Sequence, residues 1–173
     1  MLTKKQVSLI AVALASISFG GVALADSNTI AVSASIAEEC VVSGASTMPF
    51  GPLSMLDTVG PTSAASVQGA TFDATCTNGT AAPRFTYVSA NTSGSDYRML
   101  GGTSDFLVYT LYPSADASGT AIVANTATAH PAFAADGTKQ TLDVSGKVAA
   151  AAKAAKPVQS YSDVITVTVS FGA

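Results

Sequence analysis

Few residues of this 173-residue chain have the types and spacing that catalysis requires. His130 is the only histidine, and no serine or acidic residue stands at a recognisable motif distance from it. The one adjacent acidic pair is Glu38-Glu39, and neighbouring strand residues point to opposite faces of a sheet, so the two carboxylates would not share a substrate. The sequence contains no glycine-rich phosphate loop and no calcium-loop spacing of aspartates. We therefore expect a protein with no enzymatic activity, metal or cofactor.

The two cysteines are the remaining reactive pair. Cys40 shares its strand parity with Val42, and Cys76 shares its parity with Phe72 and Ala74, so both sulfurs should point into a core. An even number of cysteines in an exported chain is typical of disulfides, whereas a zinc site would need further ligands at a suitable spacing. We predict a Cys40–Cys76 disulfide.

The N-terminus indicates export. Lys4 and Lys5 precede the apolar run Val7–Phe19, and Ala23–Ala25 fits a signal-peptidase site, so residues 1–25 are predicted to be a signal peptide. A membrane anchor would need about 20 apolar residues, more than this run provides. Without its two signal lysines the chain keeps six basic residues against eleven acidic ones, a balance that argues against a nucleic-acid partner.

The elements that would hold these residues are mostly strands. Apolar and polar residues alternate with a period of two over 30–36, 72–77, 85–87 and 165–171, and the nearly all-apolar run 106–112 predicts a more buried strand. Turn dipeptides such as Asn78-Gly79 and Asp136-Gly137 separate the runs. The alanine-rich stretch Lys147–Lys156 is interpreted as a loop with at most a helical turn. This pattern predicts an all-β antiparallel sandwich or barrel.

An ordered set of motifs across most of the chain resembles the spore coat U domain family, which includes pilins of archaic (sigma-class) chaperone–usher pili. The motifs are Glu39-Cys40-Val41-Val42, Phe50-Gly51, Phe72–Thr80, Arg98-Met99-Leu100, Leu107–Tyr112 and Tyr161-Ser162-Asp163, followed by the terminal run 164–171. The chain departs from the family at 122–125, where a tryptophan-glycine is common, and at 147–156, where a Gly/Pro-rich turn is usual. These departures leave open which type of subunit it is.

The resemblance implies an incomplete immunoglobulin-like β-sandwich over residues 37–173 that is completed by a donated strand. Residues 26–36 would be the donor segment of each subunit, and the disulfide would tie the first strand to the second. The implied partners are neighbouring pilin subunits, a periplasmic chaperone and an outer-membrane usher. The implied destination is a cell-surface pilus, reached through the periplasm, that serves adhesion and biofilm formation. The implied donor residues are Ile30, Val32, Ala34 and Ile36, of which Ile36 could instead begin the first core strand, and the implied acceptor groove is formed by Ile165, Val167, Val169 and Phe171.

A second interpretation remains open for residues 26–36. Composition alone favours an ordinary first strand, which would make the protein a monomeric secreted or periplasmic binding module with a complete fold. The chain ends two residues after Phe171, so we expect no later strand to close the sheet. Donation of residues 26–36 to a neighbour would then leave an open edge and an apolar groove for another chain to cover.

Overall fold

The computed structural model describes residues 28–53, 66–153 and 156–172. The chain divides into two parts, residues 1–35 and 36–173. In the first part, residues 28–35 form neither helix nor strand, and the side chains of Ile30 and Val32 are 90% and 91% exposed. The predicted signal peptide lies outside the described residues. No helix among the described residues is long and apolar enough to cross a membrane.

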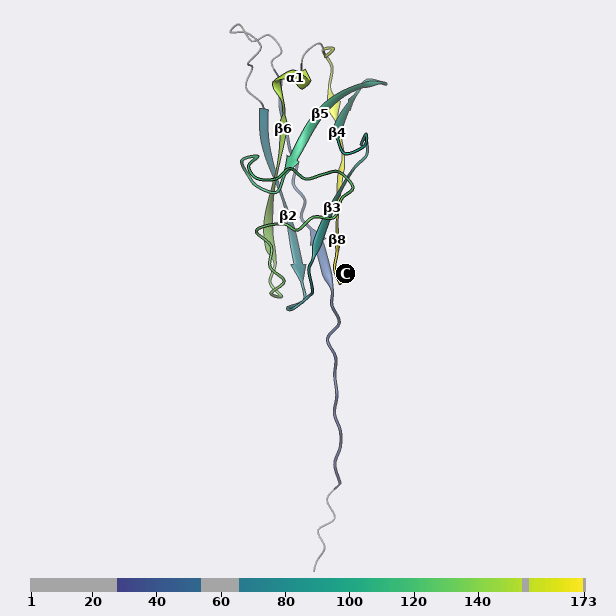
Figure 1. Ribbon diagram of the computed structural model, residues 1–173, viewed down its shortest axis with the longest axis vertical. Helices are drawn as coiled ribbons and strands as arrows, with labels where there is room; N and C mark the ends of the chain where they lie inside the picture. The colour runs from purple at the N-terminus through teal and green to yellow at the C-terminus, as the bar shows by residue number, and fades with distance from the viewer. Residues whose placement is uncertain (1–27, 54–65, 154–155, 173) are drawn as a thin grey trace, which may run out of the picture. The chain divides into compact units, whose positions relative to one another are not determined.

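The second part is an all-β sandwich-like fold, as predicted, in which every strand pair is antiparallel (Figure 1). The larger sheet has the strand order β1-β2-β6-β5-β4-β7, and the smaller sheet pairs β3 with β8. Strand bounds within the described residues are β1 Cys40–Ser43, β2 Ser66–Cys76, β3 Arg84–Ser89, β4 Tyr97–Gly101, β5 Asp105–Tyr112, β6 Gln140–Val148, β7 Tyr161–Ser162 and β8 Ile165–Ser170, and a single helical turn, α1, spans Ala150–Lys153.

The core lies between the inner faces of the two sheets. Phe72 of β2 occupies its centre and makes edge-on ring contacts with Phe85 at 5.5 Å and Tyr87 at 6.1 Å, both of which belong to β3. Aromatic pairs in this geometry add to the free energy gained by burying their area. Strand alternation supplies the other inward residues, including Tyr97, Leu107, Leu111, Leu142, Val144 and Val148.

The structure corrects two sequence expectations. The alternating run 30–36 forms no strand. The stretch 147–156 is a loop only in part, because β6 continues to Val148, whose inward side chain is fully buried; the helical turn allowed there is α1. Residues 106–112 form the largely buried strand β5, as predicted, with only Val108 exposed on the outer side and the guanidinium of Arg98 covering the ring of Phe106 at 4.1 Å.

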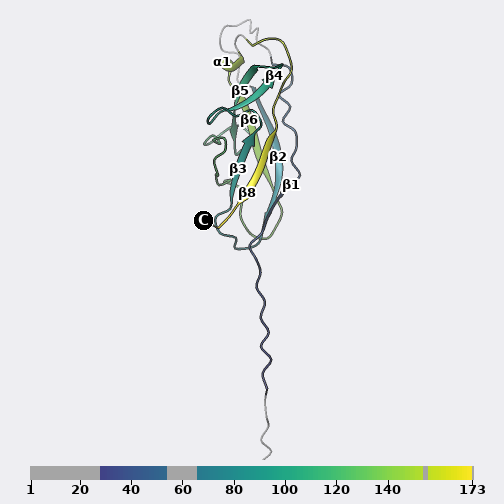
Figure 2. The same cartoon turned by 90° about the vertical axis from the view of Figure 1, so that its right-hand side faces the viewer.

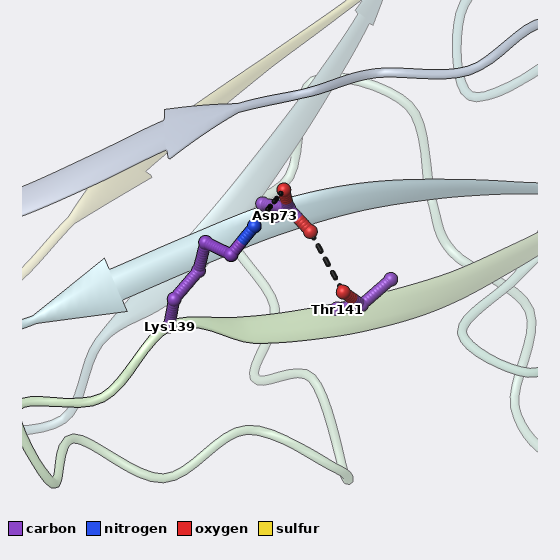
Figure 3. Close-up of polar contacts among 3 residues, drawn as sticks. All are labelled: Asp73, Lys139 and Thr141. Atoms are coloured by element: carbon purple, nitrogen blue, oxygen red, sulfur yellow. Dashed lines mark hydrogen bonds and ion pairs between the residues drawn. The ribbon is translucent and has the colours of Figure 1, made fainter.

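On the outer face of the larger sheet, polar contacts join its two longest strands, β2 and β6 (Figure 3). Asp73 on β2 accepts a hydrogen bond from Thr141 Oγ1 of β6 at 2.7 Å and forms an ion pair with Lys139 Nζ at 3.0 Å. The hydrogen bond from Thr141, and then the contact with Lys139, hold the pKa of the Asp73 carboxyl below its ordinary value. These contacts help fix the register between β2 and β6.

Candidate functional site

The last strand has one open edge. β8 pairs with β3 from Arg84↔Ser170 to Ser89↔Ile165, and no strand among the described residues pairs with its other edge. Figure 2 shows β8, in yellow, beside β3. An unpaired edge presents a row of N–H and C=O groups that can hydrogen-bond to another extended chain.

The side chains of β8 alternate between a half-buried and an exposed face. Ile165, Val167 and Val169 are half-buried and pack against the core, while Thr166, Thr168 and Ser170 are exposed. Phe171 follows the end of the strand and is 38% exposed. The inward face of β8 is therefore apolar along its whole length.

A groove of about 1330 Å³ opens beside this strand. Ile165 and Val167 line it on the β8 side, whereas Val169 and Phe171 do not contribute to its lining. Its floor is made of core side chains from several strands: Phe72, Tyr87, Met99, Leu107, Tyr109, Leu111 and Val144. We call this space the β8 groove. Its apolar lining suits a ligand that brings aliphatic side chains.

The opposite wall of the β8 groove is the segment of residues 45–53, which we call the strap. Ser46 N donates to Thr71 O at 2.8 Å and Ser46 Oγ accepts from Thr71 N at 2.7 Å, so the strap begins beside β2. Farther along, Met48 and Phe50 pack against the core near Gly146 of β6. Sequence reasoning missed this wall, because the strap has no strand periodicity; its only signal was the Phe50-Gly51 motif of the family resemblance.

A half-buried hydrogen-bond cluster fixes the start of β8. The carboxylate of Asp163 accepts hydrogen bonds from Ser89 Oγ and Tyr109 Oη, both at 2.6 Å, from Asn91 Nδ2 at 3.0 Å and from Val164 N at 2.9 Å. Burial, and then the bond to Asp163, raise the pKa of the Tyr109 hydroxyl, so this group stays a neutral donor. Asp163 thereby connects β8 to β3 and β5 at one end of the groove.

The disulfide is formed as predicted. Cys40 and Cys76 are direct partners in the register between β1 and β2, and their bond fastens the first residue of β1 to the last of β2. The residue just before it is also fastened, since Glu39 O accepts from Thr77 N at 2.8 Å and Glu39 N donates to Thr77 Oγ1 at 3.1 Å. The disulfide and these hydrogen bonds thus attach the start of β1 to the end of β2.

The four predicted donor residues are all exposed. Ile30, Val32 and Ile36 are 87–91% exposed, Ala34 is exposed as well, and none of them belongs to a strand. β1 begins at Cys40, so Ile36 lies outside the first strand of the sandwich.

His130, the first residue considered for catalysis, is held by hydrogen bonds and ring contacts of the fold. His130 Nδ1 accepts from Ala132 N at 3.3 Å, and Nε2 lies 2.9 Å from the carbonyl oxygen of Asp143, to which it donates. The rings of Phe72 and Phe85 pack edge-on against the imidazole. Across the described residues, no three His, Cys, Asp or Glu side chains gather as a metal site would require.

Comparison with known families agrees with the motif pattern and the fold. The Spore Coat Protein U domain matches residues 26–168 of the chain. The chain belongs to the spore coat protein U domain family. This family is associated with structural subunits of chaperone–usher pili rather than with enzymes. No curated protein matches the sequence.

Proposed function

We propose that this protein is a structural subunit of a cell-surface chaperone–usher pilus that polymerises by strand donation. In this proposal, residues 26–36 of one copy occupy the β8 groove of the next copy and pair with the open edge of β8. The observation that carries the proposal is that the edge of β8, with which no described strand pairs, adjoins an apolar groove lined by Ile165 and Val167 of the same strand. Addition of an extended segment to such an edge is an established mode of recognition.

The N-terminal segment has the chemistry that the groove requires. Ile30, Val32 and Ile36 are exposed and alternate with small residues, so one face of an extended strand would be aliphatic and the other small and polar. Full burial of each Ile or Val side chain contributes roughly 1.5–3 kcal/mol. Main-chain hydrogen bonds to β8 would add affinity that does not depend on side chains.

An uncovered groove of this kind promotes aggregation, which explains the proposed partners. A periplasmic chaperone would cover the edge of β8 after export, and an outer-membrane usher would exchange it for the donor segment of the next subunit. Residues 1–25 would direct the export as a signal peptide. The assembled fibre would serve adhesion and biofilm formation at the cell surface.

The proposal is tested by deleting residues 27–34 from the exported chain and measuring the mass of the purified protein by light scattering. Strand donation predicts polymers from the intact chain and, when a peptide spanning residues 27–36 fills the groove, monomers from the deleted chain. A complete-fold binding module predicts the opposite pattern, in which the intact chain is monomeric and the deletion exposes its core and causes aggregation. Polymers from the deleted chain that match those of the intact chain would refute strand donation by this segment.

A further inference from the structure

Gly146 has a role that its backbone conformation does not explain. It lies in β6 with an ordinary strand conformation, opposite Gln68 of β2 and Leu111 of β5, and its φ is not in the left-handed region. A Cβ at this position would come within 2.5 Å of Met48 Sδ and 2.7 Å of Phe50 Cζ. A side chain at this position would therefore force Met48 and Phe50 to move, since real Cβ atoms do not approach other atoms so closely.

The atoms that occupy this space are the tips of two flexible side chains of the strap. Met48 and Phe50 line the β8 groove, and the ring of Phe50 contacts the ring of Tyr109 edge-on at 6.2 Å. A methyl group on Gly146 would push these tips away without straining the backbone of β6. Gly146 consequently sets how far the strap wall stands from the opposite wall of the groove.

The two ends of β8 differ in what lies next to them. At the C-terminal end of β8, Gly172 N donates to Ala81 O at 3.1 Å, and Ala81 N donates to Glu38 Oε1 at 3.4 Å. The domain's own first residues are therefore fastened at this end. At the N-terminal end of β8, Phe50 of the strap contacts the ring of Tyr109, whose hydroxyl donates to Asp163, two residues before the strand begins.

This arrangement sets the direction of an incoming strand. If a second copy stood at the C-terminal end of β8, it would compete for space with the segment that precedes the acceptor's own β1. A head-to-tail assembly avoids this competition by placing the second copy at the strap end. The residue of the donor segment nearest the donor's own domain, Ile36, then lies nearest the strap, and the strand runs antiparallel to β8.

We propose that the strap, seated on Gly146, forms the pocket that receives Ile36 of a second copy and so selects for a bulky aliphatic side chain at that position. This inference rests on the proposed strand donation and adds a residue that determines its specificity. Met48 and Phe50 supply the apolar wall of the pocket, and Gly146 supplies the space that lets both side chains lie flat against β6. Ile30, at the other end of the strand, would not contact the strap.

The test measures binding of synthetic peptides that span residues 27–36 to the exported chain without residues 27–34, by fluorescence anisotropy, so that no donor segment of the protein competes with the peptide. Gly146→Ala should weaken binding of the unchanged peptide roughly 10-fold or more, because the pocket for Ile36 is reshaped. The matched control is Gly69→Ala in β2, where the added Cβ would meet only the carbonyl oxygen of Ala115 at 3.7 Å, an ordinary contact. Gly69→Ala should bind the peptide as the unchanged protein does.

A double-mutant cycle then identifies the peptide residue that the pocket receives. For the peptide with Ile36→Ala, replacing Gly146 in the protein should cause little further loss of affinity, because the side chain that fills the pocket is already missing. For the peptide with Ile30→Ala, Gly146→Ala should still weaken binding by the same factor as it does for the unchanged peptide. Phe50→Leu provides a second variant of the same wall, should Gly146→Ala fail to fold, and should show the same coupling to Ile36. Equal peptide affinity for Gly146→Ala and Gly69→Ala, or coupling to Ile30 instead, would overturn the inference. Absence of binding to the unchanged protein would instead overturn strand donation itself.

Discussion

Replacement of Val167 by aspartate should block assembly while leaving the subunit folded. Val167 lies in the middle of β8, opposite Tyr87, and its half-buried side chain lines the groove that the donor strand would fill. In the free subunit the new carboxylate would still reach water through the open groove, so the effect on folding should be modest. In the assembled groove it would lie between the two walls.

The magnitude of the assembly defect follows from two contributions. Because Val167 is already half-buried in the free subunit, completing its burial contributes only about 1 kcal/mol to assembly, whereas desolvation of an unpaired carboxylate costs several kcal/mol. A total of about 4 kcal/mol or more weakens the intersubunit contact roughly a thousandfold. Thr168→Asp is the matched control, because Thr168 is exposed on the opposite face of the same strand.

The assay compares the yield of sheared pili with the amount of periplasmic subunit, and measures polymer formation by the purified protein at several pH values. The apolar groove should raise the pKa of the new carboxyl in the assembled state above its value in the free subunit. Protonation then favours assembly, so the defect of Val167→Asp should shrink as the pH falls from about 8 towards about 5, through that raised pKa. Normal pili from Val167→Asp, or an equal defect in Thr168→Asp, would refute the assignment of this face to the groove.

Three further predictions concern the fold that supports the groove. Cys40→Ser should lower the free energy of unfolding by up to about 4 kcal/mol and reduce periplasmic subunit levels; unchanged denaturant midpoints would show that the disulfide is dispensable. Asp163→Ala should destabilise the domain by several kcal/mol in chemical denaturation, because buried donors such as the Tyr109 hydroxyl lose their acceptor, while Tyr109→Phe should cost less. The pKa of Asp73 is lower in the folded state than in the unfolded state, where it is about 3.9. The stability that this difference contributes is fully present at pH values above the unfolded pKa and is lost as the pH falls through the folded pKa. Thr141→Val should therefore reduce the acid sensitivity of unfolding, and an unchanged pH profile would contradict that assignment.

The disulfide, β5, β8 and parts of β2 and β3 could be predicted from the sequence because they depend on local patterns. The parity of Cys40 with Val42 and of Cys76 with Phe72 placed both sulfurs on inner faces, and the structure pairs them in register. The nearly continuous apolar run 106–112 was correctly interpreted as a more buried strand, although such a run does not show that Val108 faces outward. The strand β6 was not predicted, because Gly146 interrupts its alternation and the alanine-rich composition after Lys147 hid the buried position of Val148.

Half of the candidate site lay beyond such reasoning. The alternation of Ile165 and Val167 predicts the inward apolar face of β8, and the family resemblance alone implied that this face forms one wall of a groove. The other wall is an irregular segment, and its position depends on the contact of Met48 and Phe50 with a glycine in a distant strand. Contacts between residues so far apart in sequence leave no periodic signal, so only the fold reveals them.

The central claim is tested most directly by adding a donor strand to a subunit that lacks one. The exported chain without residues 27–34 is mixed with a peptide spanning Ser27–Ile36, and its melting temperature is measured. At a peptide concentration about 100 times the dissociation constant, binding to the folded state should add about 2.7 kcal/mol, which raises the melting temperature by roughly 5–10 °C. A peptide with Val32→Asp should lose this effect, whereas one with Ser33→Asp, on the opposite face of the strand, should keep it. A truncated protein that is as stable as the intact monomer and does not respond to the unchanged peptide would contradict strand donation.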